Sequence, residues 1–145
     1  MIAALLIAAC SPNQAAVARS PAGLEEMAVT IRSGERSHRF TVEIARTREE
    51  QSQGLMNRPA LAPDRGMIFL YEQPEPASFW MKNTLIPLDM IFIRQDGRIA
   101  RIAENTVPFS LEHVSAGEPV SAVLEIAGGR SAELGIKAGD RVEWR

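Results

Sequence analysis

Short apolar runs separated by turn signals dominate this chain and restrict it to a strand-rich fold. Residues 38–45 alternate apolar and polar side chains, the period of two that places neighbours on opposite faces of a strand. Residues 88–93 and 98–103 are further runs of this kind, and Asp96-Gly97 lies between them. An Asp-Gly pair between two such runs is typical of a tight β-hairpin. Further strands are predicted at residues 27–31, 67–71, 120–126 and 141–144.

Two short helices are predicted between the strands. Thr47 and Glu50 have the spacing of a capping box, so a helix is expected to run from there towards Met56. A second helix is predicted to end at Leu134, because Gly135 can adopt the left-handed conformation that terminates a helix. With about seven or eight strands, we expect an α+β, mainly β fold with a curved or barrel-like antiparallel sheet and two short helices.

The length and composition of the chain fit one globular domain. We expect this domain to occupy residues 27–145 of the 145 residues. Residues 11–26 are rich in Pro, Ala and small polar side chains and are predicted to form a flexible tether. The formal net charge is -2. This value argues against a nucleic-acid partner, since proteins that bind nucleic acids present a strongly basic surface.

Residues 1–10 resemble the signal segment of a bacterial lipoprotein. The apolar run at residues 2–9 has the length of a signal-peptide core and ends in Ala8-Ala9-Cys10. We therefore expect Cys10 to be lipidated and to anchor the protein on the periplasmic side of the bacterial cell envelope. A short buried helix with a free thiol is the alternative. Cys10 is the single cysteine, so no intramolecular disulfide is expected.

Residues 79–89 combine an aromatic ring, a cation, an amide, a hydroxyl and a carboxylate. If residues 79–84 are extended, Trp80, Lys82 and Thr84 share one face of the strand, and the apolar side chains between them point to the other face. A large ring beside an ammonium and a hydroxyl is a suitable platform for a polar ligand. A well-packed structural strand would use the same residues.

No motif in the chain calls for a metal or an organic cofactor. The sequence contains no Gly-x-Ser-x-Gly elbow, no His-Glu-x-x-His, no phosphate-binding glycine loop and no Cys-x-x-Cys. The methionines of the folded body lie in apolar segments, where they are expected to fill the core rather than to bind copper. The two histidines, His38 and His113, are expected to lie at the surface.

A series of motifs appears in order between residues 42 and 142: Gly54-Leu55-Met56-Asn57-Arg58, Gly66-Met67-Ile68-Phe69, Phe79-Trp80-Met81-Lys82-Asn83-Thr84, Ile86-Pro87-Leu88-Asp89, Val123-Leu124-Glu125 and Leu134-Gly135-Ile136-Lys137-Ala138-Gly139-Asp140. Together they are similar to those of the bacterial and archaeal domain-of-unknown-function family 192. The resemblance is most specific in the Trp-Met-Lys-Asn-Thr run. It implies a set of candidate ligand-binding residues: Arg58, Trp80, Lys82, Asn83, Thr84 and Asp89.

Two roles are open for these residues. In a ligand site, Trp80 would stack on the ligand, Lys82 and Arg58 would hold an anionic group, and Asn83 and Asp89 would orient hydroxyls. In a structural role, Asp89 would pair with Arg58 or Lys82, and the other side chains would fix the turn and cover the core.

The sequence therefore predicts an exported, lipid-anchored and non-catalytic envelope domain that binds a polar small molecule or an envelope protein. The membrane would be contacted through the lipid anchor. One alternative is a hydrolase or transferase in which Asp89 or Glu125 is the general base and Lys82 stabilises charge. A structural accessory of an envelope complex is the other alternative.

Overall fold

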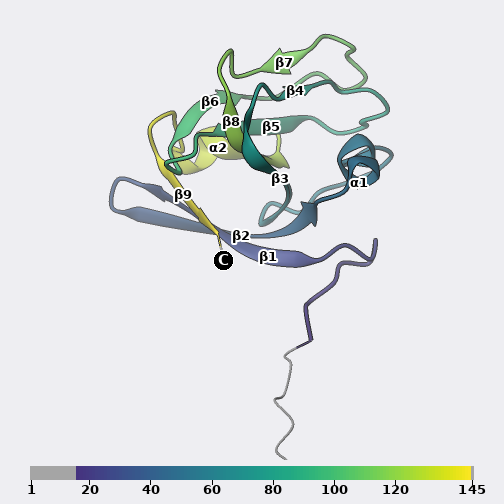
Figure 1. Cartoon of the computed structure of the whole chain (residues 1–145), viewed down its shortest axis with the longest axis horizontal. Helices are drawn as coiled ribbons and strands as arrows, with labels where there is room; N and C mark the ends of the chain where they lie inside the picture. The colour runs from purple at the N-terminus through teal and green to yellow at the C-terminus, as the bar shows by residue number, and fades with distance from the viewer. Residues whose placement is uncertain (1–15, 145) are drawn as a thin grey trace, which may run out of the picture.

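The computed structural model describes residues 16–144, which form a large curled sheet, a small two-stranded sheet and two short helices (Figure 1). The order of strands in the large sheet is β6-β5-β8-β3-β2-β1-β9, and β4 pairs with β7 in the small sheet. The α+β, mainly β class predicted from the sequence is confirmed. The elements are β1 (Glu26–Ser33), β2 (Arg36–Ala45), α1 (Arg48–Gln53), β3 (Arg65–Glu75), β4 (Ser78–Phe79), β5 (Leu88–Ile93), β6 (Ile99–Ala103), β7 (Val114–Ser115), β8 (Val120–Ala127), α2 (Arg130–Leu134) and β9 (Arg141–Trp144).

The two edges of the large sheet meet at one end, so the sheet forms a half-barrel. Arg98, just before β6, forms an antiparallel bridge with Arg141 of β9. The amide of Ile99 donates a hydrogen bond to the carbonyl of Asp140 at 2.9 Å. The expected curved sheet is therefore present, and its curvature is completed by contacts between the strands that are farthest apart in the sheet order.

One strand pair departs from the expected antiparallel arrangement. β2 and β3 are parallel, whereas the other pairs in the large sheet are antiparallel. Parallel neighbours need a crossover connection, and α1 lies in the connection between these two strands. The helix is thereby placed beside β3 on one side of the sheet (Figure 1).

The middle strands of the large sheet are buried on both faces along residues 66–69 of β3, the whole of β5 and most of β8. The buried part of β3 falls largely within residues 67–71, which the sequence predicted to be apolar on both sides. One face lies inside the curl and packs under the segment that follows α2. Its core includes Val29, Phe40, Ile68, Ile91, Leu124 and Ile136. The other face is covered by α1, the small sheet and the segment after β4. Its core includes Leu55, Met67, Phe69, Met81, Met90 and Val123.

The predicted helix signals are present in the structure. The Thr47 side chain accepts a hydrogen bond from the amide of Glu50, and the Glu50 carboxylate accepts one from the amide of Thr47, which completes the capping box. Gly54 caps the C-terminal end of α1. Gly135 caps α2 with a φ of 70°, the left-handed conformation that its place in the sequence indicated.

The N-terminal part of the described chain is hydrogen-bonded to the sheet. The amide of Glu26 donates to the carbonyl of Ala18 at 3.0 Å, and the amide of Ile44 donates to the carbonyl of Glu25 at 2.8 Å. Ordered contacts thus begin before Met27, within the segment predicted as a tether. The predicted signal segment and Cys10 lie outside the described residues. Within residues 16–144, no helix is long and apolar enough to cross a membrane.

Candidate functional site

The segment that carries the Trp-Met-Lys-Asn-Thr run is a short strand followed by a turn. β4 ends at Phe79, and Asn83 has a φ of 53° in the turn that follows. The segment is therefore not extended over residues 79–84, and Trp80 and Lys82 are exposed. Thr84 does not share their face, because the turn carries it inward until it is 5% exposed. Its hydroxyl donates a hydrogen bond to the carbonyl of Lys82 at 3.1 Å.

Trp80 is held between basic side chains at the surface. The Nζ atom of Lys82 lies 5.1 Å from the centroid of the Trp80 ring, within the range of a cation–π interaction. The ring of His113 stacks against Trp80 with centroids 5.8 Å apart and an interplanar angle of 23°. The Nδ1 atom of His113 lies 3.0 Å from the hydroxyl oxygen of Ser78. His113 is exposed, as expected, and it also fixes the position of the indole ring.

Asp89 lies apart from this cluster, inside the protein. It is 0% exposed, and its carboxylate accepts hydrogen bonds from three backbone amides. Asn105 and Gly129 donate to Oδ1 at 2.9 Å, and Ser131 donates to Oδ2 at 2.8 Å. Both carboxylate oxygens are therefore occupied by the backbone. Asp89 joins β5 to the loop after β6 and to the beginning of α2.

Arg58 and Asn83 also have structural partners. Arg58 forms an ion pair with Glu43 at 2.6 Å, and among the described residues Asp89 forms no ion pair with Arg58 or Lys82. Glu43 is 3% exposed, although the alternation of residues 38–45 places it on the polar face of the strand. The carbonyl of Asn83 accepts a hydrogen bond from the amide of Asn57 at 2.8 Å. This bond ties the turn after β4 to the segment after α1.

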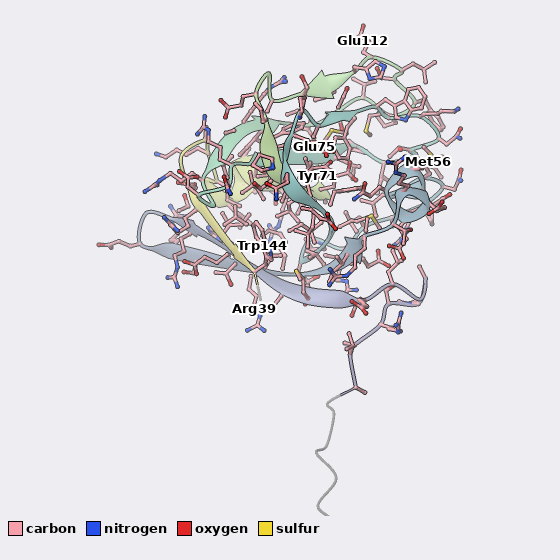
Figure 2. The ribbon with its side chains drawn as sticks, in the orientation of Figure 1. Arg39, Met56, Tyr71, Glu75, Glu112 and Trp144 are labelled. Carbon is pink, nitrogen blue, oxygen red and sulfur yellow. The ribbon has the colours of Figure 1, made fainter. Side chains whose placement is uncertain are left out.

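A cavity of about 490 Å³ lies between α1 and the chain that connects β3 to Trp80. Figure 2 shows Tyr71 and Glu75, which both come from β3, with Met56 on the side of α1. Of the six candidate residues, Trp80 and Thr84 contribute to this cavity. Its polar lining is formed by Arg48, Gln51, Ser52, Gln53, Tyr71, Glu75, Ser78, Thr84 and Glu125, and its apolar lining includes Leu55, Met56, Phe69, Phe79 and Trp80.

Glu125 lines the buried part of this cavity. The residue belongs to β8 and is 4% exposed. Burial raises the pKa of its carboxyl group to about 8, so the group carries its proton at neutral pH. No described residue makes a hydrogen bond or an ion pair with it. Burial, together with the charges of Glu75 and Glu125, also raises the pKa of the Tyr71 hydroxyl well above its usual range.

Comparison with known proteins identifies the family. A model of domain of unknown function 192 (DUF192), described as an uncharacterized ACR, matches residues 29–144. The chain belongs to the DUF192 family. A crystal structure of a protein of unknown function from Novosphingobium aromaticivorans DSM 12444 is 49% identical, with a TM-score of 0.86 over 90% of this chain and 94% of that chain. No curated protein matches.

A second solved structure has the same fold. It is described as a candidate transcription regulator from Sinorhizobium meliloti 1021 and is 43% identical to this DUF192 chain. Its TM-score is 0.81, over 83% of this chain and 95% of that chain. These likenesses extend over nearly the whole described part of the chain, so the half-barrel and the elements around the cavity belong to one shared fold.

The sequence of this DUF192 domain already sets Glu125 apart, because it is the one charged residue in the apolar segment 120–127. β8 has buried residues on both faces, and Glu125 is the charged residue among them. Such a position is costly for a carboxyl group, and a costly position indicates a functional constraint. Tyr71 and Glu75 gave no comparable signal. They reach the cavity because β3 loses its register with β8 between Leu70 and Glu75.

The loop that carries Trp80 and the loop beside it expose large apolar side chains, and we call these two loops the apolar rim. The amide of Met81 donates to the carbonyl of Ser110 at 2.9 Å, so the loop after β4 runs beside the loop that precedes β7. Phe109 is 59% exposed and has a φ of 64°, which is unusual for an aromatic residue. The exposed apolar residues of these two loops are Trp80, Leu85, Val107, Phe109 and Leu111.

Proposed function

We propose that this DUF192 domain binds a small polar ligand in the cavity above Glu125. The observation that carries the proposal is the Glu125 carboxyl, which is buried at the cavity without a described partner. A buried polar group without a hydrogen bond costs about 1–3 kcal/mol. A ligand that completes this bond would recover that free energy.

The contrast with the other buried carboxylates supports this interpretation. Asp89 accepts three backbone amides, Glu43 pairs with Arg58, and Asp140 accepts a hydrogen bond from the amide of Lys137. Each of these three carboxyl groups has at least one donor, although Glu43 Oε1 has no partner, whereas Glu125 has no donor among the described residues. The cavity volume also lies within the usual range of small-molecule sites, about 300–1,000 Å³.

Native mass spectrometry of the protein purified from its own cell envelope tests the proposal. The wild-type protein should carry a bound small molecule, and Glu125→Gln, which keeps the size of the side chain, should lose most of it. Glu72→Gln is the matched control, because Glu72 is an exposed residue of β3 outside the cavity lining. A wild-type protein without bound ligand, or equal occupancy in the Glu125 variant, would contradict the proposal.

Catalysis at the same cavity is the second candidate. The observation that favours it is the pKa of Glu125, since a carboxyl group that titrates near neutral pH can both donate and accept a proton. Asp89, the other predicted general base, is fully buried outside the cavity lining, and both of its oxygens accept backbone amides. A catalytic Glu125 predicts that Glu125→Gln converts no ligand but still binds it, whereas a pure binding site predicts loss of binding.

We further propose that the domain is exported and held at the periplasmic side of the bacterial envelope by a lipid on Cys10. The support is the apolar run at residues 2–9, which ends in small residues and a cysteine. Cys10→Ser should move the protein from the membrane fraction to the soluble fraction and leave the precursor uncleaved. Wild-type protein in the cytosol with Met1 retained would refute this location.

A further inference from the structure

We propose that the ligand of the Glu125 cavity carries a cationic nitrogen, an ammonium or guanidinium group, which lies against Glu125 and Glu75. The inference rests on the proposed binding function and adds the chemical class of the ligand. It follows from the hydrogen-bonding roles that remain open in the lining and from the charges of that lining.

Two amide side chains in the lining already donate to backbone carbonyls. Gln51 donates from Nε2 to the carbonyls of Ala45 at 3.3 Å and Leu70 at 3.5 Å. Gln53 donates from Nε2 to the carbonyl of Met56 at 3.4 Å. Both amide groups keep a carbonyl oxygen without a described donor.

The same holds for the hydroxyl and carboxyl groups. The Thr84 hydroxyl has donated its hydrogen to the carbonyl of Lys82, so its oxygen remains as an acceptor. Glu75 is exposed at the wall, and Glu125 has no described donor. The lining therefore offers acceptors at these amide and hydroxyl oxygens and at Glu75, and at Glu125 once its proton is lost; Arg48, Ser52 and Tyr71 are donors in the same lining. The acceptors suit a ligand that brings several N–H donors. Ammonium and guanidinium groups carry several N–H donors and have no hydrogen-bond acceptor.

The charges and rings of the lining favour the same class. Glu75 and Glu125 both influence the Tyr71 hydroxyl, so the two carboxyl groups act on one region of the cavity. Arg48 is the basic residue in the described lining, so the lining has a net negative charge once Glu125 has lost its proton. Other aromatic rings at the cavity, those of Phe69, Tyr71 and Phe79, can also attract a cation.

A cation at this place couples binding to the ionisation of Glu125. The charged or titratable groups that line the cavity with Glu125 are Tyr71 and Glu75 of β3 and Arg48 of α1. The Glu43–Arg58 ion pair lies on the same face of the sheet as Glu125, with Met67 between Glu43 and Glu125. In the free protein the carboxyl is protonated below about pH 8. A cation binds the ionised form, so binding should release a proton and become stronger as the pH rises towards 8.

Three five-carbon compounds with different end groups provide a matched test. Cadaverine, 1,5-pentanediol and glutarate have ammonium, hydroxyl and carboxylate ends on chains of equal length. In two-dimensional amide NMR titrations of the full chain, cadaverine should shift the resonances of cavity residues at lower concentration than the other two. A stronger effect of the diol or the diacid would overturn the cationic class while leaving the proposed binding function intact.

The pH dependence gives a second readout. The affinity for cadaverine should rise on the order of 20-fold between pH 6.5 and 8.5, if binding requires ionised Glu125. Glu125→Gln should weaken binding and remove this dependence, and Glu72→Gln should retain both. Calorimetry in two buffers of different ionisation enthalpy should detect the released proton. An affinity that is flat or falls over this range would overturn the proposal.

A fourth compound in the same titration distinguishes a free small-molecule cation from a lysine side chain of a protein. Nα-acetyl-lysine amide presents the same ammonium as part of a peptide-like molecule, so stronger binding of this compound than of cadaverine would indicate a lysine side chain of a protein. If none of the probes shifts cavity resonances, the cationic class is wrong. The co-purified ligand sought by native mass spectrometry then decides separately whether the cavity binds a molecule of another class.

Discussion

Glu125 lies directly opposite Met67 in the antiparallel pair of β8 and β3, so its carboxyl group shares a sheet face with a buried thioether. Met90 of β5 faces Glu125 from the other side. Side chains opposite one another in a sheet lie on the same face at close distance. The carboxyl is therefore flanked by apolar neighbours, which explains why burial is the cause of its raised pKa.

The first prediction concerns stability and pH. The ordinary pKa of a glutamate carboxyl is 4.5, which we take for the unfolded chain, and in the folded protein the pKa of Glu125 is about 8. Below pH 4.5 both states are protonated. Between pH 4.5 and 8 the unfolded chain loses this proton and the folded protein keeps it, so the contribution of Glu125 to stability falls as the pH rises and is level above about 8. The total loss should be on the order of a few kcal/mol.

Glu125→Gln should remove this loss, because glutamine does not ionise. Urea unfolding at pH 5, 7 and 9 should show similar stability for the two proteins at pH 5 and a clear advantage of the variant at pH 9. Glu72→Gln at an exposed position should follow the wild type at each pH. A variant that differs from the wild type by the same amount at pH 5 and pH 9 would mean that the folded carboxyl titrates normally.

The second prediction concerns Asp89, which we now expect to stabilise the fold. Asp89→Asn keeps one acceptor oxygen and turns an amide group towards the backbone N–H groups that the second oxygen accepted from. Because hydrogen bonds to a charged group contribute about 1.5–3 kcal/mol, the variant should lose at least about 2 kcal/mol of unfolding free energy. The exposed Asp64→Asn serves as control in the same urea titration. Equal stability of the two variants would show that the three amides do not depend on the carboxylate.

The third prediction concerns α1, which forms one wall of the cavity. Thr47→Ala removes the acceptor for the amide of Glu50 and should cost about 1 kcal/mol in thermal or urea unfolding. Because Gln51 follows within the same helix, loosening of the first turn should also weaken ligand binding. Glu49→Gln, in the same turn but outside the capping box, should change stability by less than half as much. A neutral Thr47→Ala would mean that packing alone holds the helix.

Local signals made much of the fold predictable. The Asp96-Gly97 turn and the alternating runs beside it correspond to the β5–β6 hairpin, and Thr47 with Glu50 forms the predicted capping box. Each signal lies within a few residues and acts through local backbone geometry. The parallel pairing of β2 with β3 had no local signal, because it depends on how a crossover segment returns to the sheet.

The candidate site was less predictable for the same reason. Alternation predicted one shared face for Trp80, Lys82 and Thr84, but the strand ends before Trp80 and the turn that follows carries Thr84 inward. Glu125 reaches the cavity through the register of β8 with β3, and Tyr71 through the irregular end of β3. These relations depend on residues far apart in the sequence.

The last prediction concerns Phe109 in the rim loop. Its φ of 64° is a left-handed conformation that costs an aromatic residue roughly 1–2 kcal/mol, and 59% of the residue is exposed. Asn tolerates this conformation, so Phe109→Asn should leave the unfolding free energy unchanged or raise it by up to about 1 kcal/mol, whereas the β-branched Phe109→Val should lower it by about 1 kcal/mol. Leu111→Asn, which is similarly exposed, should be neutral within about 0.5 kcal/mol.

Urea unfolding of the three variants separates backbone strain from packing at this loop. If Phe109→Asn and Phe109→Val destabilise the protein equally, the ring contributes packing that outweighs the conformational cost. If asparagine is tolerated and valine is not, the native sequence retains an aromatic side chain at a position where its backbone is strained and its ring is exposed. Strain of this kind is concentrated at functional sites. That second result would assign the apolar rim beside Trp80 to function rather than to stability.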